Sequence, residues 1–175
     1  QLALPGTAYI YQGEELGLEE VEDIPDELRQ DPTWVQSGFN DVGRDGCRVP
    51  LPWSNSSAPY GFSPVPTTTW LPQPEHWGPH TVSAQDGDPV SFLNLYRAAL
   101  ALRPKLWVRA PEVSWLPGSR GALGFARGDV QCWVNTGERE FELPVGFDVA
   151  LTSVPGVGAV LPPDAAAWIV AACDS

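Results

Sequence analysis

The stretch LPGTAYIYQGEELG, residues 4–17, decides which fold the first half of the chain is expected to adopt. Pro5-Gly6 ends an apolar helical turn, and Thr7–Tyr11 is a run of β-branched and aromatic residues typical of a strand. Because the apolar character of this run is nearly continuous, we expect a strand buried on both faces, as in a parallel sheet. Gln12–Glu15 then leave the carboxyl end of the strand, where α/β folds place their ligands.

A long irregular segment, residues 19–88, follows this strand. Prolines interrupt it throughout, and no lysine or arginine occurs from Val49 to Tyr96. We nevertheless expect a folded loop system packed over a sheet edge or a barrel mouth, because disordered segments are poor in aromatic residues. The tryptophans of this segment are Trp34, Trp53, Trp70 and Trp77.

A helix is predicted from Asp88-Pro89 to Pro104. Asp88 suits an N-cap, Pro89 suits the first helical position, and apolar residues then recur at helical spacing. Beyond residue 104 the apolar residues recur at every second position, which predicts antiparallel strands. The sequence thus predicts a boundary near residue 104, with an α/β domain over residues 1–103 and a meander or small antiparallel β-sandwich over residues 104–175. The alternating segments are Val113–Trp115, Leu123–Phe125, Val130–Val134, Phe141–Leu143 and Trp168–Ala172.

The charge balance argues against a nucleic-acid partner. Ten lysines and arginines face 22 acids, for a net charge of −12, whereas phosphate neutralisation needs clustered cations. The acids are concentrated between Glu14 and Asp31, where Arg29 is the only basic residue. We expect these acids to form a solvated surface, because they lack the ligand spacing of a calcium site.

The cysteines and the hydropathy bear on location. Cys47, Cys132 and Cys173 are widely spaced and odd in number, which argues against zinc and favours reduced thiols in the cytoplasm, with a disulfide between two of them left open. No apolar run approaches the roughly 20 residues that span a bilayer, and no secretory signal opens the chain. We expect no metal, no other cofactor and no membrane partner.

The stretch GRDGCRVPLPW, residues 43–53, has the composition of a ligand-binding loop. Planar guanidinium groups donate paired hydrogen bonds to neighbouring hydroxyls or to carboxylates, and tryptophan faces stack on sugar rings. Arg44, Arg48 and Trp53 therefore predict a loop beside a polar, ring-shaped ligand.

Three motifs in this order resemble the α-amylase superfamily of glycoside hydrolases, family 13. Residues 4–17 resemble its eighth barrel strand, residues 44–53 are similar to the segment that follows in the α-glucosidase and oligo-1,6-glucosidase branch, and residues 91–103 resemble the final barrel helix. The resemblance covers essentially all of the chain. It implies the carboxyl-terminal end of a (β/α)8 barrel, with last strand, long loop and last helix, followed by a small β domain.

The resemblance implies a retaining α-glucosidase acting on short α-linked glucosides of the maltose or isomaltose type. Such enzymes use a nucleophile and an acid/base carboxylate about 5–5.5 Å apart. In the family these groups and a third carboxylate follow strands four, five and seven, upstream of the match here. The Asn-His-Asp signature of the family is absent, and His76 and His80 stand in other contexts. Since the chain also lacks methionine, we expect it to be part of a longer enzyme, to hold no catalytic residue and to be inactive alone.

The resemblance implies that an arginine of this loop reaches the sugar. Arg48 is expected to contact the oligosaccharide, the alternative being an arginine held by Asp41 or Asp45 to shape the loop. Arg44 is the second candidate, with a structural role favoured for it. Asp45 is expected to order the loop by accepting hydrogen bonds from backbone amides or an arginine. Glu14 and Glu15 are expected to make structural hydrogen bonds to neighbouring loops, the alternative being that one of them faces the site. Trp53 is equally suited to sugar stacking and to core packing. His76 and His80 are expected in packing or surface roles, and Cys47 is expected to be a small buried filler.

Two other functions remain open at this point. One is a relative of the trehalose synthase or glucosyltransferase type, because a single loop change can replace water by a sugar as acceptor. The other is a non-catalytic scaffold subunit on the same fold.

Overall fold

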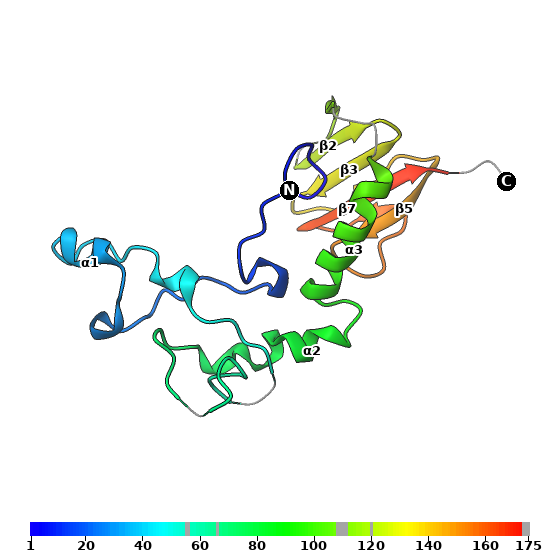
Figure 1. Cartoon of the computed structure of the whole chain (residues 1–175). Helices are drawn as coiled ribbons and strands as arrows, with labels where there is room; N and C mark the ends of the chain where they lie inside the picture. Colours follow the sequence, from blue (N-terminus) through cyan, green and yellow to red (C-terminus); the bar gives the residue numbers. More distant parts are fainter. Residues whose placement is uncertain (55–56, 66, 108–111, 120, 173–175) are drawn as a thin grey trace. The chain divides into compact units, whose positions relative to one another are not determined.

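The computed structural model describes residues 1–54, 57–65, 67–107, 112–119 and 121–172 (Figure 1). The chain forms two compact units. The first contains Gln1–Tyr9 and Leu95–Ser175, and the second contains Ile10–Asn94. The division into domains at residues 103 and 104 stays a prediction.

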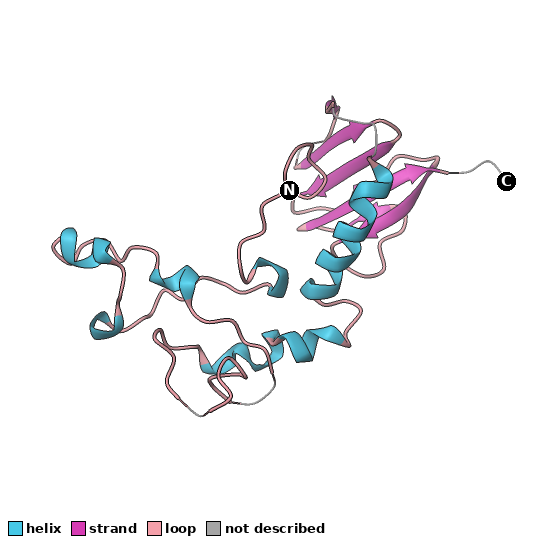
Figure 2. Ribbon diagram, viewed as in Figure 1, coloured by secondary structure: helices cyan, strands magenta, loops and turns pink. Residues whose placement is uncertain are grey.

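An antiparallel sheet of five strands organises the first unit (Figure 2). The strand order is β1-β2-β3-β7-β5, so that the first three strands form a meander. A separate pair, β4 and β6, forms a two-stranded sheet. The predicted antiparallel strands are thereby confirmed. The bounds are β1 Ser114–Leu116, β2 Ala122–Arg127, β3 Val130–Asn135, β4 Phe141–Glu142, β5 Phe147–Thr152, β6 Val160–Leu161 and β7 Ala165–Ala171.

The two faces of the five-stranded sheet carry separate apolar cores, because successive side chains of a strand point to opposite faces. Cys132 and Trp168 lie in one core, in which burial raises the pKa of the Cys132 thiol to about 11. Trp133 and Ile169 lie in the other, together with Leu161 of β6. This alternation is the pattern that the sequence displays after residue 104.

Helix α3, Phe92–Leu106, covers the first of these faces. Ala99 is buried there, with Leu102 and Leu106 packed beside it. The helix starts three residues later than predicted, because the Asp88 carboxylate accepts from the amide of Val90 in a turn, while Ser91 Oγ accepts from the amide of Asn94. It also continues for two residues past Pro104, since a proline in the last turn removes only one bond of the ladder.

The second unit consists of short helices joined by loops. Its core holds Trp77 and Leu71 among six buried residues, so the expectation of a folded loop system is confirmed. Trp53 and Trp70, however, are about half exposed and do not contribute to that core. The helices are η1 Glu14–Leu16, η2 Asp26–Leu28, α1 Pro32–Gln36, η3 Asp45–Arg48, η4 Glu75–His80 and α2 Val82–Asp86.

The strand predicted over Thr7–Tyr11 does not form within the described part of the chain. Tyr9 is 80% exposed, and Ile10 and Tyr11 are also exposed. A strand requires a neighbour that satisfies its amide and carbonyl groups, and this segment has no such neighbour among the described residues.

None of the helices in the described residues combines the length and the apolarity that crossing a membrane requires.

Candidate functional site

The loop that carries Arg44 and Arg48 is built around a buried carboxylate. Asp45, the first residue of η3, is only 1% exposed. Its Oδ2 accepts hydrogen bonds from the backbone amides of Gln30 (2.6 Å) and Asp31 (2.9 Å). These bonds fasten residues 43–48 to the chain entering α1, and the expectation that Asp45 orders the loop is confirmed.

Asp31 is the second carboxylate that holds this loop, and it accepts hydrogen bonds from three donors. Its Oδ1 accepts from the amide of Thr33 at 2.9 Å, as the N-cap of α1. Its Oδ2 accepts from the amide of Arg44 at 2.9 Å and from Nη1 of Arg48 at 3.0 Å. The amides of Thr33 and Arg44 lower the pKa of Asp31 to about 2, with a smaller contribution from the charge of Arg48.

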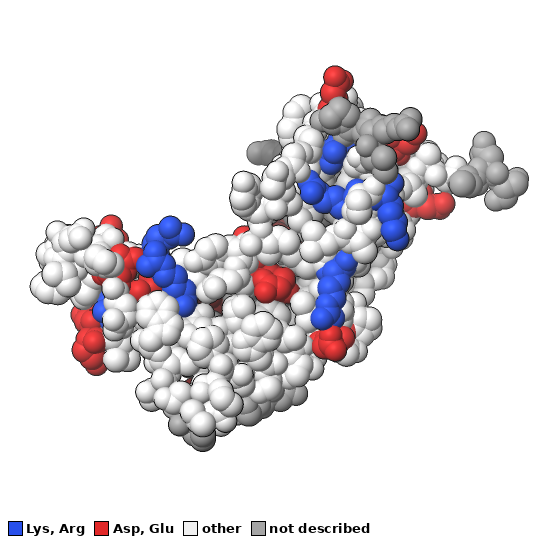
Figure 3. Space-filling view, in the orientation of Figure 1, with Lys and Arg blue, Asp and Glu red and all other residues white. Residues whose placement is uncertain are grey.

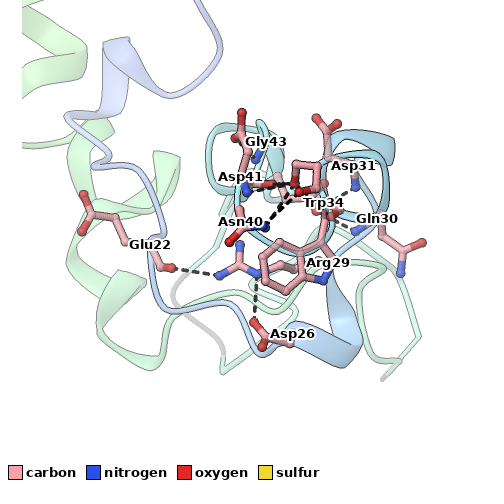
Figure 4. A network of polar contacts seen from close by, with 11 residues as sticks. Glu22, Asp26, Arg29, Gln30, Asp31, Trp34, Asn40, Asp41 and Gly43 are labelled. Atoms are coloured by element: carbon pink, nitrogen blue, oxygen red, sulfur yellow. Dashed lines mark hydrogen bonds and ion pairs between the residues drawn. The ribbon is translucent and has the colours of Figure 1, made fainter.

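Arg29 stabilises the neighbouring turn (Figure 4). Its Nε donates to Oδ1 of Asp26 at 3.3 Å, its Nη2 donates to the carbonyl of Glu22 at 3.4 Å, and its guanidinium lies 5.3 Å from the centroid of the Trp34 ring. The acids around this turn, from Glu19 to Glu27, are exposed, as expected for a solvated surface. Asp31, by contrast, is buried and bonded, and Glu14 and Glu15 are only partly exposed.

Two glycines allow the close approach of these segments. Gly43 has a positive φ of +68°, and a Cβ there would lie 2.6 Å from Cγ of Asp31. At Gly46 a Cβ would lie 2.5 Å from the carbonyl oxygen of Val21. The loop therefore needs glycine at both positions to keep Asp31 and Asp45 where they are.

The structure places Arg44 and Arg48 on one short loop but in different settings. Arg48 is held by Asp31, not by Asp41 or Asp45, and its side chain remains 38% exposed. Arg44 contributes its backbone amide to Asp31, whereas the residue as a whole is exposed. Contact of either arginine with a sugar stays a prediction.

The carboxylates of the loop make hydrogen bonds within it, and Asp31 is not suited to act as a general acid. A general acid in glycoside hydrolysis needs a raised pKa, and that of Asp31 is lowered. Oδ2 of Asp45 is engaged by two amides inside the loop. Glu15 accepts from the amide of Gly13 at 3.0 Å, a structural bond within its own turn rather than to a neighbouring loop.

A cavity of about 130 Å³ lies beside η1 and η3. Glu14, Glu20, Cys47 and Trp77 are among its lining residues. The Oε2 atom of Glu14 is buried and has no hydrogen-bond partner among the described residues, so the structural bond predicted for Glu14 is not made by that atom. Cys47 is half-buried rather than buried, with its thiol 3.2 Å from the carbonyl of Arg44.

The remaining candidates lie apart from the two arginines. Trp53 is half exposed, so core packing does not occupy it fully. His76 is at the surface, 3.0 Å from Oε1 of Glu19, and Nδ1 of His80 lies 3.4 Å from the carbonyl of Leu16. Both histidines have packing or surface roles, as expected. Cys173 lies outside the described residues.

Asp31 is the residue that the sequence analysis missed, although a signal was present. Asp31-Pro32 is the pattern of an N-cap followed by a proline in the first helical turn. The same pattern was used at Asp88-Pro89, where the helix begins only at Phe92. At Asp31 the dense acidic surroundings suggested a solvated surface instead.

Comparison with known proteins adds to this geometry. The model of the alpha-amylase catalytic domain matches residues 1–110, which include the whole of the loop at 43–53. The chain is 42% identical over 127 residues to a probable alpha-glucosidase of Rhizobium meliloti (strain 1021), a match that covers 72% of this chain and 22% of that protein. It is 32% identical over 117 residues to the oligo-1,6-glucosidase of Parageobacillus thermoglucosidasius, covering 57% of this chain and 20% of that protein.

Solved structures resemble the chain over nearly its whole length. The alpha-glucosyl transfer enzyme XgtA matches with a TM-score of 0.75 and 30% identity, covering 98% of this chain and 34% of that one. The trehalose-6-phosphate hydrolase of Bacillus licheniformis matches with a TM-score of 0.76 over 98% of this chain and 37% of that one, and its 20% identity supports the fold alone. The chain spans about a fifth of the length of the curated relatives and about a third of these structures.

Proposed function

Because the chain belongs to the alpha-amylase family of glycoside hydrolases, we propose that it forms the carboxyl-terminal part of a retaining α-glucosidase that hydrolyses short α-linked glucosides. The observation that carries the proposal is the 42% identity to a probable alpha-glucosidase. Other relatives are named alpha-glucosidase or oligo-1,6-glucosidase, which supports the same substrate class.

In this proposal residues 1–103 complete a (β/α)8 barrel that a longer chain begins. Thr7–Tyr11 would be its last strand, paired with strands supplied by the preceding polypeptide. The exposure of Tyr9, Ile10 and Tyr11 supports this, because a run of such residues is expected to be covered. The reactive carboxylates would come from the same preceding polypeptide.

Arg48 is proposed as the sugar-contacting residue of this chain. A guanidinium has five N–H donors, and the contact with Asp31 uses only Nη1. The partial exposure of the side chain leaves its other donors accessible to sugar hydroxyls. Asp31, being ionised at neutral pH, would hold the guanidinium in one orientation, and the more exposed Arg44 would be the second contact.

The cytoplasm is the proposed location, and the free thiols support it. Cys47 and Cys132 are not joined by a disulfide in the described part of the chain. Reduced cysteines are typical of cytoplasmic proteins.

Substitution of arginines in a longer chain that supplies the upstream carboxylates tests the proposal. We expect Arg48→Met to lower kcat/KM for maltose and for nitrophenyl α-glucoside about tenfold or more, since hydrogen bonds to a charged donor are lost. Arg29→Met is the matched control, because Arg29 bonds an acid of the same unit outside the loop. Equal effects of the two substitutions would contradict the role of Arg48, and absence of hydrolysis by the longer enzyme would contradict the function itself.

Transfer of glucose to a sugar acceptor is the second candidate function. The 30% identity to an alpha-glucosyl transfer enzyme over nearly the whole chain favours it. Product analysis separates the two functions, since a hydrolase releases only glucose from maltose, whereas a transferase also forms longer or isomeric oligosaccharides.

A further inference from the structure

Two arginines line a cavity of about 300 Å³ in the first unit, away from the loop that carries Arg48. Arg103 comes from α3 and Arg127 from the end of β2, and Trp107 lies between the helix end and the sheet. The described residues that line this cavity include no carboxylate. Figure 3 shows basic side chains gathered over α3 on the face of this unit that it displays.

The hydrogen bonds that Arg103 makes with described residues all go to backbone carbonyls. Arg103 donates through Nε to the carbonyl of Leu2 at 2.8 Å, and through Nη2 to the carbonyls of Leu4 at 3.0 Å and Gly6 at 2.6 Å. Arg127 donates through Nη1 to the carbonyl of Ala3 at 2.8 Å. Within the described residues, Nη1 of Arg103 makes no hydrogen bond and therefore keeps two donors for a ligand.

The two cations are close enough to disfavour each other. Arg127 is only 6% exposed, and its guanidinium lies 5.0 Å from the centroid of the Trp107 ring. Burial lowers the pKa of Arg127, and the charge of Arg103 lowers it further. A negative ion between them would reduce both effects, because it favours the charged form of each group.

Trp107 supplies a third, independent indication. Trp107 is only 7% exposed, and its indole Nε1 has no acceptor among the described residues. A buried indole N–H without an acceptor is unusual, because the lost hydration is not replaced. An oxyanion in the cavity that Trp107 lines would provide the missing acceptor.

We propose that Arg103, Arg127 and the indole N–H of Trp107 form a binding site for a tetrahedral oxyanion of the phosphate type. The site combines the donor types that such anions select, two guanidinium forks and a ring N–H, and two of its three residues, Arg127 and Trp107, are buried. It does not depend on the function proposed above, because it lies in the unit that contains the β-sheet and uses none of the loop residues.

Titration of the chain with sodium phosphate, followed by the indole N–H signals in ¹H–¹⁵N NMR, tests the site directly. We expect the Trp107 signal, identified by Trp107→Phe or by backbone-linked assignment, to shift and to saturate. Sodium chloride at matched ionic strength should leave it in place. A Trp107 signal that does not respond to phosphate, or that responds equally to chloride, would overturn the proposal.

Variants then identify the donors. We expect Arg103→Met to weaken phosphate binding about tenfold or more, since charged hydrogen bonds are lost. Arg103→Lys, which keeps the charge but not the planar fork, should weaken it less, and it serves if Arg103→Met does not fold. Arg97→Gln is the control, because Arg97 is an exposed arginine of the same helix that does not line the cavity. Equal binding by Arg103→Lys, Arg97→Gln and the unmodified chain would contradict the assignment of Arg103.

The source of the anion is a separate arm of the same experiment. Inorganic phosphate and methyl phosphate are compared at equal concentration. Tighter binding of inorganic phosphate indicates a site for the free ion, and equal or tighter binding of the ester indicates a phosphoryl group of a larger ligand. Both results support the site, whereas binding of neither overturns it.

Discussion

At the scale of single residues, Asp31 determines the shape of the candidate site. It caps α1, accepts a hydrogen bond from the amide of Arg44 and orients the side chain of Arg48. Three contacts that shape the loop therefore depend on one carboxylate. The pKa of this group is lowered mainly by backbone amides rather than by the arginine. We therefore predict that Arg48→Met leaves the pKa of Asp31 below its ordinary value of 3.8. Measurement of the side-chain carboxyl ¹³C shift against pH checks this.

The sign of the pH dependence follows from the lowered value. Because the folded-state pKa of about 2 lies below the ordinary 3.8, ionised Asp31 stabilises the loop fully above that ordinary value. The contribution is lost as pH falls from 3.8 towards 2. A pKa that returns to its ordinary value in Arg48→Met would mean that the arginine, not the amides, dominates.

Two glycines with the same backbone conformation provide a matched test of packing. Gly43 and Gly38 both have φ of +68°, so alanine brings similar backbone strain at each. At Gly38 the nearest atom to an added Cβ is Nδ2 of Asn40 at 3.8 Å, whereas at Gly43 it is Cγ of Asp31 at 2.6 Å. We predict that Gly43→Ala destabilises the chain by about 1–3 kcal/mol more than Gly38→Ala, by urea unfolding. Equal losses would show that Asp31 can move aside without cost.

The sequence predicted the roles of residues whose hydrogen bonds follow from the residue type and its immediate neighbours. The amide-binding role of Asp45 follows from a short acid in a glycine-rich turn, and the structure confirms it. The partner of Arg48 could not be deduced, because Asp31 lies 17 positions away and reaches the arginine only through the folding of the intervening loop. Local sequence patterns do not predict a contact between residues so far apart in the chain.

At the scale of elements, the start of α3 offers a test. Ser91 Oγ accepts from the amide of Asn94 at 3.3 Å and lies 2.8 Å from the carbonyls of Gln85 and Asp88. We predict that Ser91→Ala destabilises the chain by about 1 kcal/mol, the usual effect of losing an N-cap, in chemical unfolding. Asp88→Ala, which removes only the turn bond to Val90, should cost less. A larger loss of stability in Asp88→Ala would instead identify Asp88 as the N-cap, as the sequence predicts.

The strands show why the spacing of apolar residues predicts some strands and not others. β3 and β7 alternate between two cores, so their apolar residues follow the expected period of two. β5, Phe147–Thr152, was missed, since it is mostly half-buried or exposed and lacks that contrast. Thr7–Tyr11 has strong strand character in composition but no partner among the described residues, because pairing is a property of two segments.

At the scale of the whole molecule, the order of three motifs was more informative than any one of them. The family assigned from that order is confirmed by the match over residues 1–110. The antiparallel character of the strands in the first unit is confirmed too. The closure of a barrel by residues 1–103 remains a proposal, because it requires polypeptide beyond this chain.

The central claim is that this chain supplies an arginine-bearing loop and a β-sheet unit to a sugar-cleaving pocket whose reactive acids lie elsewhere. Hydrolysis of nitrophenyl α-glucoside by the chain of residues 1–175 tests it most directly, with a longer chain that carries the upstream carboxylates as the positive control. We predict no turnover above the uncatalysed rate for the chain alone and clear turnover for the longer one. Turnover by the chain alone that persists through repeated purification would contradict the claim, because its acids would then suffice for the reaction.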